Sequence, residues 1–80
     1  MKLKIKLNSV ADAGLFVRTC SEFQEDIDVY YHRFILDGKS VMGILSMDLS
    51  EGCSVNINTD DENVKTKFKE SMSLWIVKED

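Results

Sequence analysis

The stretch Leu3-Lys4-Ile5-Lys6-Leu7-Asn8 alternates apolar and polar side chains without interruption. A period of two also runs through residues 27–32 and 53–58, where each odd position carries an isoleucine, valine, tyrosine or cysteine. Successive side chains of a β-strand point to opposite faces, so this pattern predicts three strands that bury one face and leave the other in water. We therefore expect a sheet that is covered by helices on one side only.

Two helices are predicted by apolar residues that recur at spacings of three and four. The first opens at Ser9, because residues 9–12 resemble a capping box with a shorter acid, and the last opens at the capping box of residues 59–62. Gly14 weakens the first helix by ~1 kcal/mol relative to alanine, and we expect it to allow a close approach to the sheet. The expected buried stripes are Ala13, Phe16, Val17, Cys20 and Phe23 in the first helix, and Val64, Phe68, Met72, Trp75 and Ile76 in the last.

The middle of the chain holds a short third strand at residues 34–36, and the position of one turn beside it is ambiguous. Asp37-Gly38 reads locally as a hairpin turn. Residues 40–47 are apolar without a clear period, and residues 50–52 are a turn signal. The resulting order, strand-helix-strand-strand-short helix-strand-helix, predicts a two-layer α+β sandwich, a class that also includes ferredoxin-like modules.

Length and composition exclude several classes of protein. With 80 residues, 44% apolar and 30% charged, the chain suits a single globular domain, expected to span residues 1–80. The net charge of −4 argues against nucleic-acid binding, since such proteins concentrate lysine and arginine. No apolar run approaches the ~20 residues that span a bilayer. Lysines interrupt the N-terminal apolar residues, which argues against a signal peptide and for a cytoplasmic protein without membrane contact.

The cysteines do not indicate a metal or redox site. Cys20 and Cys53 lie far apart and form no C-x-x-C pair. Both fall on apolar faces of predicted elements, so we expect buried free thiols. A metal ion would need more ligands than two cysteines and His32 supply. We expect neither a metal nor a cofactor.

Three stretches resemble the HPr family of the bacterial sugar phosphotransferase system. The first covers residues 16–23 and 26–29, which look like the end of the family's first helix and the entry to its next strand. The third covers the Glu51-Gly52 turn, the strand after it and the acidic cap of the last helix. The second and most specific is close to the family's regulatory-serine motif, K-S-I-M-G-[LVI]-[ML]-S-L, and reads Lys39-Ser40-Val41-Met42-Gly43-Ile44-Leu45-Ser46-Met47.

This resemblance implies a fold and places the ambiguous turn. HPr proteins are open-faced β-sandwiches of order β-α-β-β-α-β-α, with an antiparallel four-stranded sheet and helices on one face. By the family pattern, the tight turn between the second and third strands lies at His32-Arg33. Asp37-Gly38 then leads into a short helix that starts at Ser40.

The family's active motif, G-L-H-A-R-P-A, is where the chain departs from the family. One alignment matches it to residues 14–20, with Phe16 in place of the histidine and Thr19 in place of the proline. That alignment shortens the first helix by roughly two turns. The other alignment keeps the helix intact and shortens the catalytic loop, so that Ser9 is the residue nearest to the position of the family's histidine. We favour the second, because it preserves the apolar stripe; both leave no histidine at the phosphorylation position.

The carrier reaction needs an imidazole at a helix N-terminus, where N–H groups stabilise the phosphoryl group. Phe16 cannot accept a phosphoryl group, and a phosphate ester on Ser9 would transfer far less readily than a phosphoimidazole. His32 is the sole histidine and is expected in an exposed turn away from the lost loop. We therefore predict no catalytic residues and no enzymatic activity. A carrier that uses a different residue is a third hypothesis, which we do not favour.

Ser40 is the candidate regulatory site, since the resemblance implies phosphorylation of this serine by an ATP-dependent kinase. A phosphate at a helix cap meets free N–H groups and the positive end of the helix dipole, and Lys39 adds a neighbouring positive charge. The alternative is that Ser40 is simply an N-cap worth ~1 kcal/mol. Asp37 and the missing loop count against docking of the kinase.

By the same resemblance, Val41, Met42 and Leu45 form an exposed patch for protein partners, whereas we expect Ile44 in the core. The implied partners are an HPr kinase/phosphorylase, sugar phosphotransferase enzymes or a catabolite-control regulator. We expect a regulatory protein switched at Ser40, or alternatively a binding or scaffold module that kept only the fold. The chain is expected to be a monomer or a weak homodimer, formed through the exposed sheet face or residues 75–77.

Overall fold

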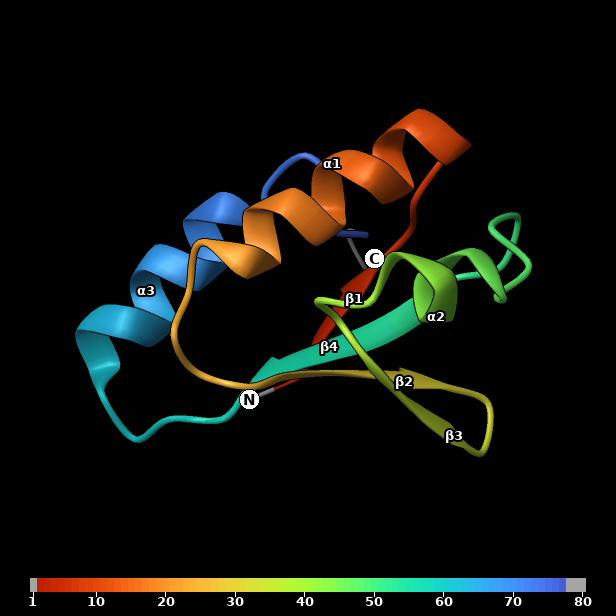
Figure 1. Cartoon of the computed structure of the whole chain (residues 1–80). Coiled ribbons are helices and arrows are strands. Elements are labelled where there is room, and N and C mark those ends of the chain that lie inside the picture. The colour runs from red at the N-terminus through yellow and green to blue at the C-terminus, as the bar shows by residue number, and fades with distance from the viewer. Residues whose placement is uncertain (1, 78–80) are drawn as a thin grey trace.

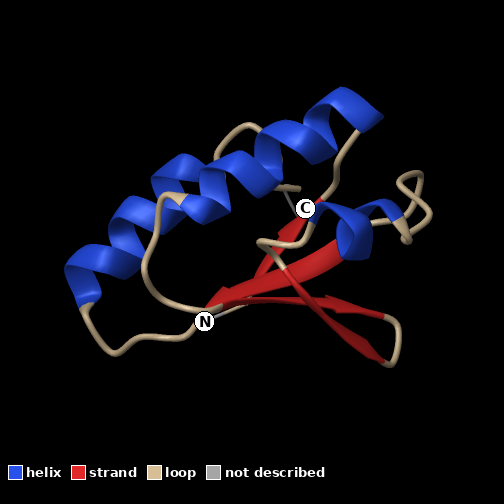
Figure 2. Ribbon diagram, viewed as in Figure 1, coloured by secondary structure: helices blue, strands red, loops and turns tan. Residues whose placement is uncertain are grey.

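A single antiparallel sheet forms one layer of the molecule, and three helices lie together on one of its faces (Figures 1 and 2). The computed structural model describes residues 2–77. The strand order is β1-β4-β2-β3, with every neighbouring pair antiparallel. The elements along the chain are β1 (Leu3–Ile5), α1 (Val10–Ser21), β2 (Ile27–Tyr31), β3 (Phe34–Asp37), α2 (Val41–Leu45), β4 (Cys53–Ile57) and α3 (Glu62–Ser71). The predicted α+β class and element order are confirmed.

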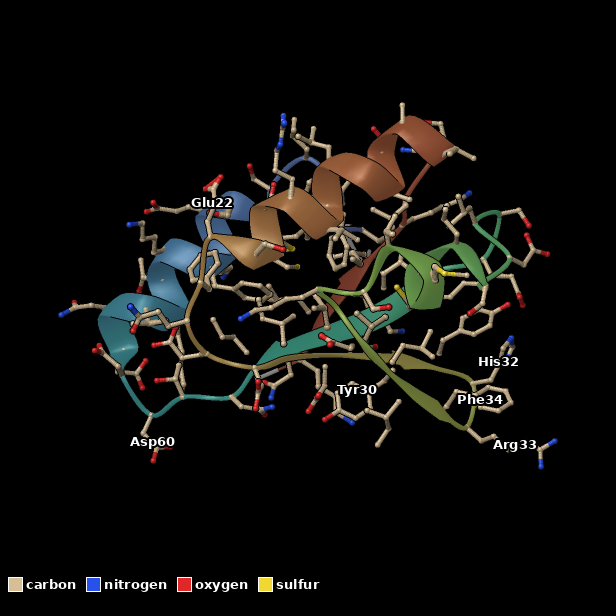
Figure 3. The ribbon with its side chains drawn as sticks, in the orientation of Figure 1. Glu22, Tyr30, His32, Arg33, Phe34 and Asp60 are labelled. Carbon is tan, nitrogen blue, oxygen red and sulfur yellow. The ribbon has the colours of Figure 1, made fainter. Side chains whose placement is uncertain are left out.

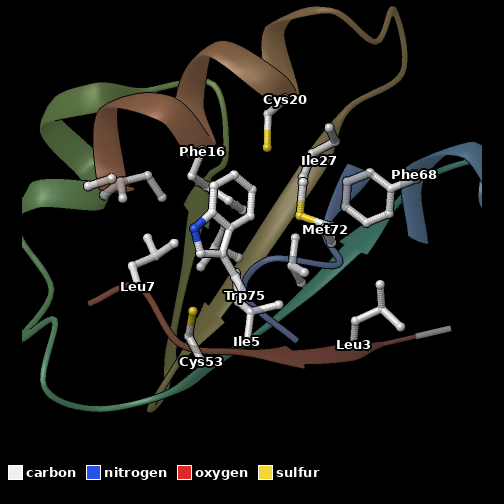
Figure 4. Packing of buried hydrophobic residues seen from close by; sticks show 14 of the residues in the cluster. Leu3, Ile5, Leu7, Phe16, Cys20, Ile27, Cys53, Phe68, Met72 and Trp75 are labelled. Carbon is white, nitrogen blue, oxygen red and sulfur yellow. The ribbon is translucent and has the colours of Figure 1, made fainter. Parts of the chain in front are cut away.

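The pairing of the strands gathers their apolar residues on one face. Leu3 lies opposite Val55, and Val55 lies opposite Val29 on its other side. This row continues into the core, where α1 and α3 cover it (Figure 4). The ring of Phe16 meets the ring of Trp75 edge to face, with 5.7 Å between centroids. Aromatic pairs favour this geometry, so both rings contribute packing energy beyond their buried area.

The start of α1 is held by the predicted capping box, with one difference in its partners. The Ser9 hydroxyl accepts a hydrogen bond from the Asp12 N–H at 3.1 Å. The Asp12 carboxylate reaches back to the N–H of Asn8, also at 3.1 Å, rather than to that of Ser9. Two N–H groups at the helix start are thereby satisfied, which accounts for a helix that begins only a few residues after β1.

Gly14 does not serve a close approach to the sheet, and that expectation is wrong. The residue is exposed on α1, and a Cβ added there would meet no atom within 4 Å. The Gly14→Ala variant should therefore raise the free energy of unfolding by about 1 kcal/mol, because alanine loses less backbone entropy in a helix. Urea denaturation checks this value.

Gly38→Ala is the matched control, since its Cβ would lie 2.8 Å from Cγ2 of Ile27. We expect this second variant to be destabilised. A Gly14→Ala variant that is no more stable than the wild type would contradict the account of α1.

The last helix begins later and ends earlier than its sequence pattern indicates. Its N-cap is Asp61, and the Thr59 hydroxyl instead accepts the N–H of Asp61 at 3.1 Å in a turn before the helix. The helix ends at Ser71, so Trp75 and Ile76 are not helical as expected. Tight turns continue the same spacing past the helix end, with Trp75 N–H donating to the Met72 carbonyl at 2.9 Å. The stripe therefore stays buried without helical structure.

The segment after α3 closes the β1 edge of the sheet. Ile76 forms an antiparallel bridge with Ile5, and the Lys6 N–H donates to the Trp75 carbonyl at 2.9 Å. Val77 donates to the Lys4 carbonyl at 2.9 Å. Trp75 is only 4% exposed. These residues pair with β1 of their own chain, and dimerisation through residues 75–77 stays a prediction.

The turn between β2 and β3 lies at His32-Arg33, as the family pattern indicates. His32 has a φ of 52°, a left-handed value that a tight two-residue hairpin turn requires. Gly38 instead leads out of β3, and its N–H donates to the Ile27 carbonyl at 2.8 Å. The close approach to Ile27 leaves no room for a Cβ, which explains the glycine. None of the helices within residues 2–77 has the length and apolar content needed to cross a bilayer.

Candidate functional site

The N-terminal end of α1 holds no group that could carry a phosphoryl group as imidazole does. Only residues 6–9 connect β1 to α1, and Leu7 within them is buried. Helix α1 is continuous through residues 14–20. Phe16 lies inside this helix and is fully buried. The alignment that makes residues 14–20 the catalytic loop is therefore wrong, and the alignment with a shortened loop fits the structure.

His32 lies at the tip of the β2–β3 hairpin, apart from α1 (Figure 3). Its side chain is 59% exposed, and its Nε2 lies 3.2 Å from the Glu51 carboxylate. The imidazole is therefore available to solvent, but no helix N-terminus lies beside it in the hairpin. This is the exposed turn position that the sequence indicates.

Ser40 is the N-cap of α2. Its hydroxyl accepts a hydrogen bond from the Gly43 N–H at 3.2 Å, and its carbonyl accepts the N–H of Ile44 at 3.0 Å. The residue is half-buried. The Asp37 carboxylate lies close in the chain and accepts the Lys39 N–H at 2.9 Å. The expected capping role of Ser40 is thus confirmed for the unmodified side chain.

The Lys39 ammonium has a partner that the sequence did not indicate. It donates a hydrogen bond of 2.6 Å to the carbonyl of Phe23, just past the end of α1. Cations near a helix C-terminus are stabilised by its unpaired carbonyls. Lys39 therefore ties the start of α2 to the end of α1 in the unmodified protein. Its support of a phosphate on Ser40 stays a prediction, and it would require this bond to break.

The apolar residues of α2 divide between surface and core. Met42 is 81% exposed, while Val41 and Leu45 are each a little under half exposed. Ile44 is fully buried and anchors the helix to the core. These exposures match the expected patch, which we call the α2 patch. The role of the patch in binding stays a prediction.

A second polar cluster holds the β2–β3 hairpin against the loop that follows α2. The Tyr31 hydroxyl donates to Glu51 at 2.5 Å and accepts the Asp48 N–H at 3.1 Å. The hydrogen bonds from Tyr31 and His32 hold the pKa of Glu51 below its ordinary value. No local pattern could have revealed this cluster, because its members lie 17 and 20 residues apart from Tyr31.

A protein-family model matches most of this chain. The family model for the PTS HPr component phosphorylation site matches residues 10–73. The chain belongs to the HPr family. The match starts at the first residue of α1 and includes Ser40 and the α2 patch. His32 is the one histidine inside it.

Solved HPr structures have the same fold. The chain is similar to an HPr of Thermoanaerobacter tengcongensis, with 26% identity, a TM-score of 0.71 and 91% of each chain covered. It also resembles HPr of Bacillus anthracis, at 17% identity and a TM-score of 0.69, with 94% of this chain and 95% of that chain covered. Crh of Bacillus subtilis follows at 18% identity and a TM-score of 0.63, covering 92% and 88%. The crystal structure of Crh is an intertwined, domain-swapped dimer.

The thiols of this HPr family member are buried. Cys20 and Cys53 are free, as predicted. Burial raises the pKa of Cys20 to about 12 and that of Cys53 to about 11, so both stay protonated at neutral pH. Within the described residues, no group of three histidine, cysteine or acidic side chains is placed to hold a metal ion.

Proposed function

We propose that this HPr family member is a regulatory, protein-binding protein of the cytoplasm and not a histidine phosphocarrier. The observation that carries this proposal is the start of α1. A four-residue connection, residues 6–9, replaces a catalytic loop there, and the side chain at the competing position, Phe16, is buried in the core. Phosphoryl transfer through imidazole needs an exposed histidine at a helix N-terminus, and this chain has none there.

We further propose that Ser40 is the site of regulation. Its hydroxyl caps α2, so oxygens of an attached phosphate could accept the N–H that the hydroxyl now accepts from Gly43. The phosphate would also bring a charge of about −1.5 to −2 beside the α2 patch. That charge would change which protein surfaces the patch accepts. By resemblance, the modifying enzyme is an HPr kinase/phosphorylase, and the readers are sugar phosphotransferase enzymes or a catabolite-control regulator, a role consistent with the name of Crh as a catabolite repression protein.

Incubation with an HPr kinase and ATP tests this proposal. We expect one phosphate per chain, located on Ser40 by tandem mass spectrometry, and none on Ser40→Ala. Ser46→Ala is the matched control, because Ser46 lies at the other end of the same helix and should leave the modification unchanged. An unmodified wild-type chain, or a phosphate on another residue, would contradict regulation at Ser40.

The alternative function is a binding module that is not regulated by phosphorylation. The bond from Lys39 to Phe23 favours it, since this cation is already engaged away from Ser40. Pull-down with the wild type, Ser40→Asp and Met42→Lys separates the two functions. A partner lost with Met42→Lys but retained with Ser40→Asp would support the unregulated module.

A further inference from the structure

The two edges of the sheet differ in their protection. The β1 edge is closed by Ile76 and Val77 of the same chain. Within residues 2–77, strand β3 pairs only with β2 and forms the other edge. An open edge strand is a template for another strand, and natural proteins usually protect it with lysine, proline or a bulge. Strand β3 contains neither lysine nor proline, and Asp37 is its one charged residue.

Two large apolar side chains of β3 are exposed, whereas Leu36 packs against the core. Phe34 is 57% exposed and Ile35 is 65% exposed, although both are large and apolar. Phe34 and its neighbour Arg33 lie at the outer end of the hairpin (Figure 3). Ile35 is on the helix-free face of the sheet, opposite Tyr30 of β2. A strand added to this edge would cover apolar side chains on both faces.

The backbone of β3 directs the N–H and C=O groups of Ile35 away from β2, where a further strand could bind them. The hairpin closes with Tyr31 opposite Phe34, and in a two-residue hairpin this pair is hydrogen-bonded. Bonded positions alternate along an antiparallel pair, so the N–H and C=O of Ile35 point away from β2. The bond from Gly38 N–H to Ile27 has the same phase. The Asp37 carbonyl already accepts the Ser40 N–H at 3.0 Å, so α2 begins where this free edge ends.

We infer that β3 pairs antiparallel with β3 of a second copy of this chain, about a two-fold axis at Ile35. In this register Ile35 faces Ile35 of the second copy, and Phe34 faces Leu36. Arg33 then lies opposite Asp37, twice by symmetry. Opposite charges across strands stabilise a pair. Shifting the register by two residues would instead place Arg33 opposite Ile35 or opposite Lys39, which matches the charges less well.

Sedimentation velocity over a range of concentrations tests the pairing. The wild type should pass from monomer to dimer as concentration rises. Arg33→Asp or Asp37→Arg alone should weaken dimerisation on the order of tenfold, because each makes both facing pairs like-charged. An equimolar mixture of the two variants should regain the dimer, since every facing pair is then Asp with Arg. The double variant should regain it alone.

Folding controls keep the test decisive. Asp37 faces Asp28 within the chain, so arginine at position 37 meets an acid there and should preserve the fold. Circular dichroism melts of each variant check this. Ile35→Lys, an exposed change at the centre of the interface, should abolish dimers. A wild type that is monomeric at every concentration would overturn the inference. So would a dimer that is indifferent to all these changes, as a domain-swapped dimer would be.

Discussion

The Phe16→His variant is expected to lose about 3–5 kcal/mol of unfolding free energy and to gain no carrier activity. Phe16 is fully buried, and its ring packs edge to face on Trp75. Imidazole is smaller, so it loses apolar contact. Its ring nitrogens would also need hydrogen-bond partners in the core, where every buried side-chain polar atom of the described residues already has one. A typical small domain has only about 5–15 kcal/mol of stability, so the loss is a large fraction of the total.

The cost should depend on pH. Burial disfavours the charged imidazolium, so the pKa of the introduced histidine is lower in the folded state than its value of about 6.5 in the unfolded chain. Below that unfolded pKa the unfolded state binds more protons than the folded state, and the variant therefore loses further stability as pH falls. Above about pH 7.5 both states carry neutral imidazole, and this additional loss disappears.

Urea denaturation of Phe16→His at pH 8 and pH 5.5 measures both effects. Leu15→His is the matched control, because Leu15 is adjacent on α1 and 44% exposed. It should change stability by less than about 1 kcal/mol, with little dependence on pH. A Phe16→His protein as stable as the wild type at pH 5.5 would show that this side chain is not part of the core.

Much of the fold is visible in the sequence because its signals are local. Alternation at residues 3–7 and 53–58 predicts the strands, since a period of two assigns each side chain to a face. Ser9 and Asp12 predict the start of α1, because they form its capping hydrogen bonds within one turn. These features depend on neighbours a few residues apart and need no knowledge of the tertiary structure.

The incorrect predictions arise where contacts between residues far apart in the sequence determine the local structure. The spacing of Trp75 and Ile76 continues a helical period, but pairing with β1 takes this segment out of the helix. Gly14 is a helix weakener without a packing reason, and only the structure shows the open space around it. The local hairpin signal of Asp37-Gly38 is also misleading, and the turn at His32-Arg33, which the family pattern predicted, is confirmed.

The candidate site was visible in part. The resemblance of the motif around Ser40 to the HPr family predicted the helix cap and the exposed Met42, and the structure confirms both placements. The bond from Lys39 to Phe23 joins residues 16 positions apart, and the Tyr31–Glu51 bond spans 20. Pattern reasoning could not place these contacts, since they depend on how the elements pack.

The second large effect that we expect is that the wild-type chain accepts no phosphoryl group as a carrier. Enzyme I transfers its phosphoryl group to imidazole in this family, and the connection of residues 6–9 offers only the Ser9 hydroxyl. That hydroxyl is engaged by the Asp12 N–H. The one imidazole, His32, sits on a hairpin beside the carboxylate of Glu51, whose negative charge opposes an incoming phosphoryl group. We therefore expect no acid-labile phosphate on any residue.

Incubation of the wild-type chain with enzyme I and phosphoenolpyruvate measures this directly, by intact mass before and after acid treatment. An HPr protein that carries the motif histidine is the positive control, and His32→Gln identifies any label on the hairpin. We expect an unchanged mass for the wild-type chain while the control is fully labelled. Stoichiometric, acid-labile phosphate on the wild-type chain would contradict the proposal that this HPr family member is not a phosphocarrier.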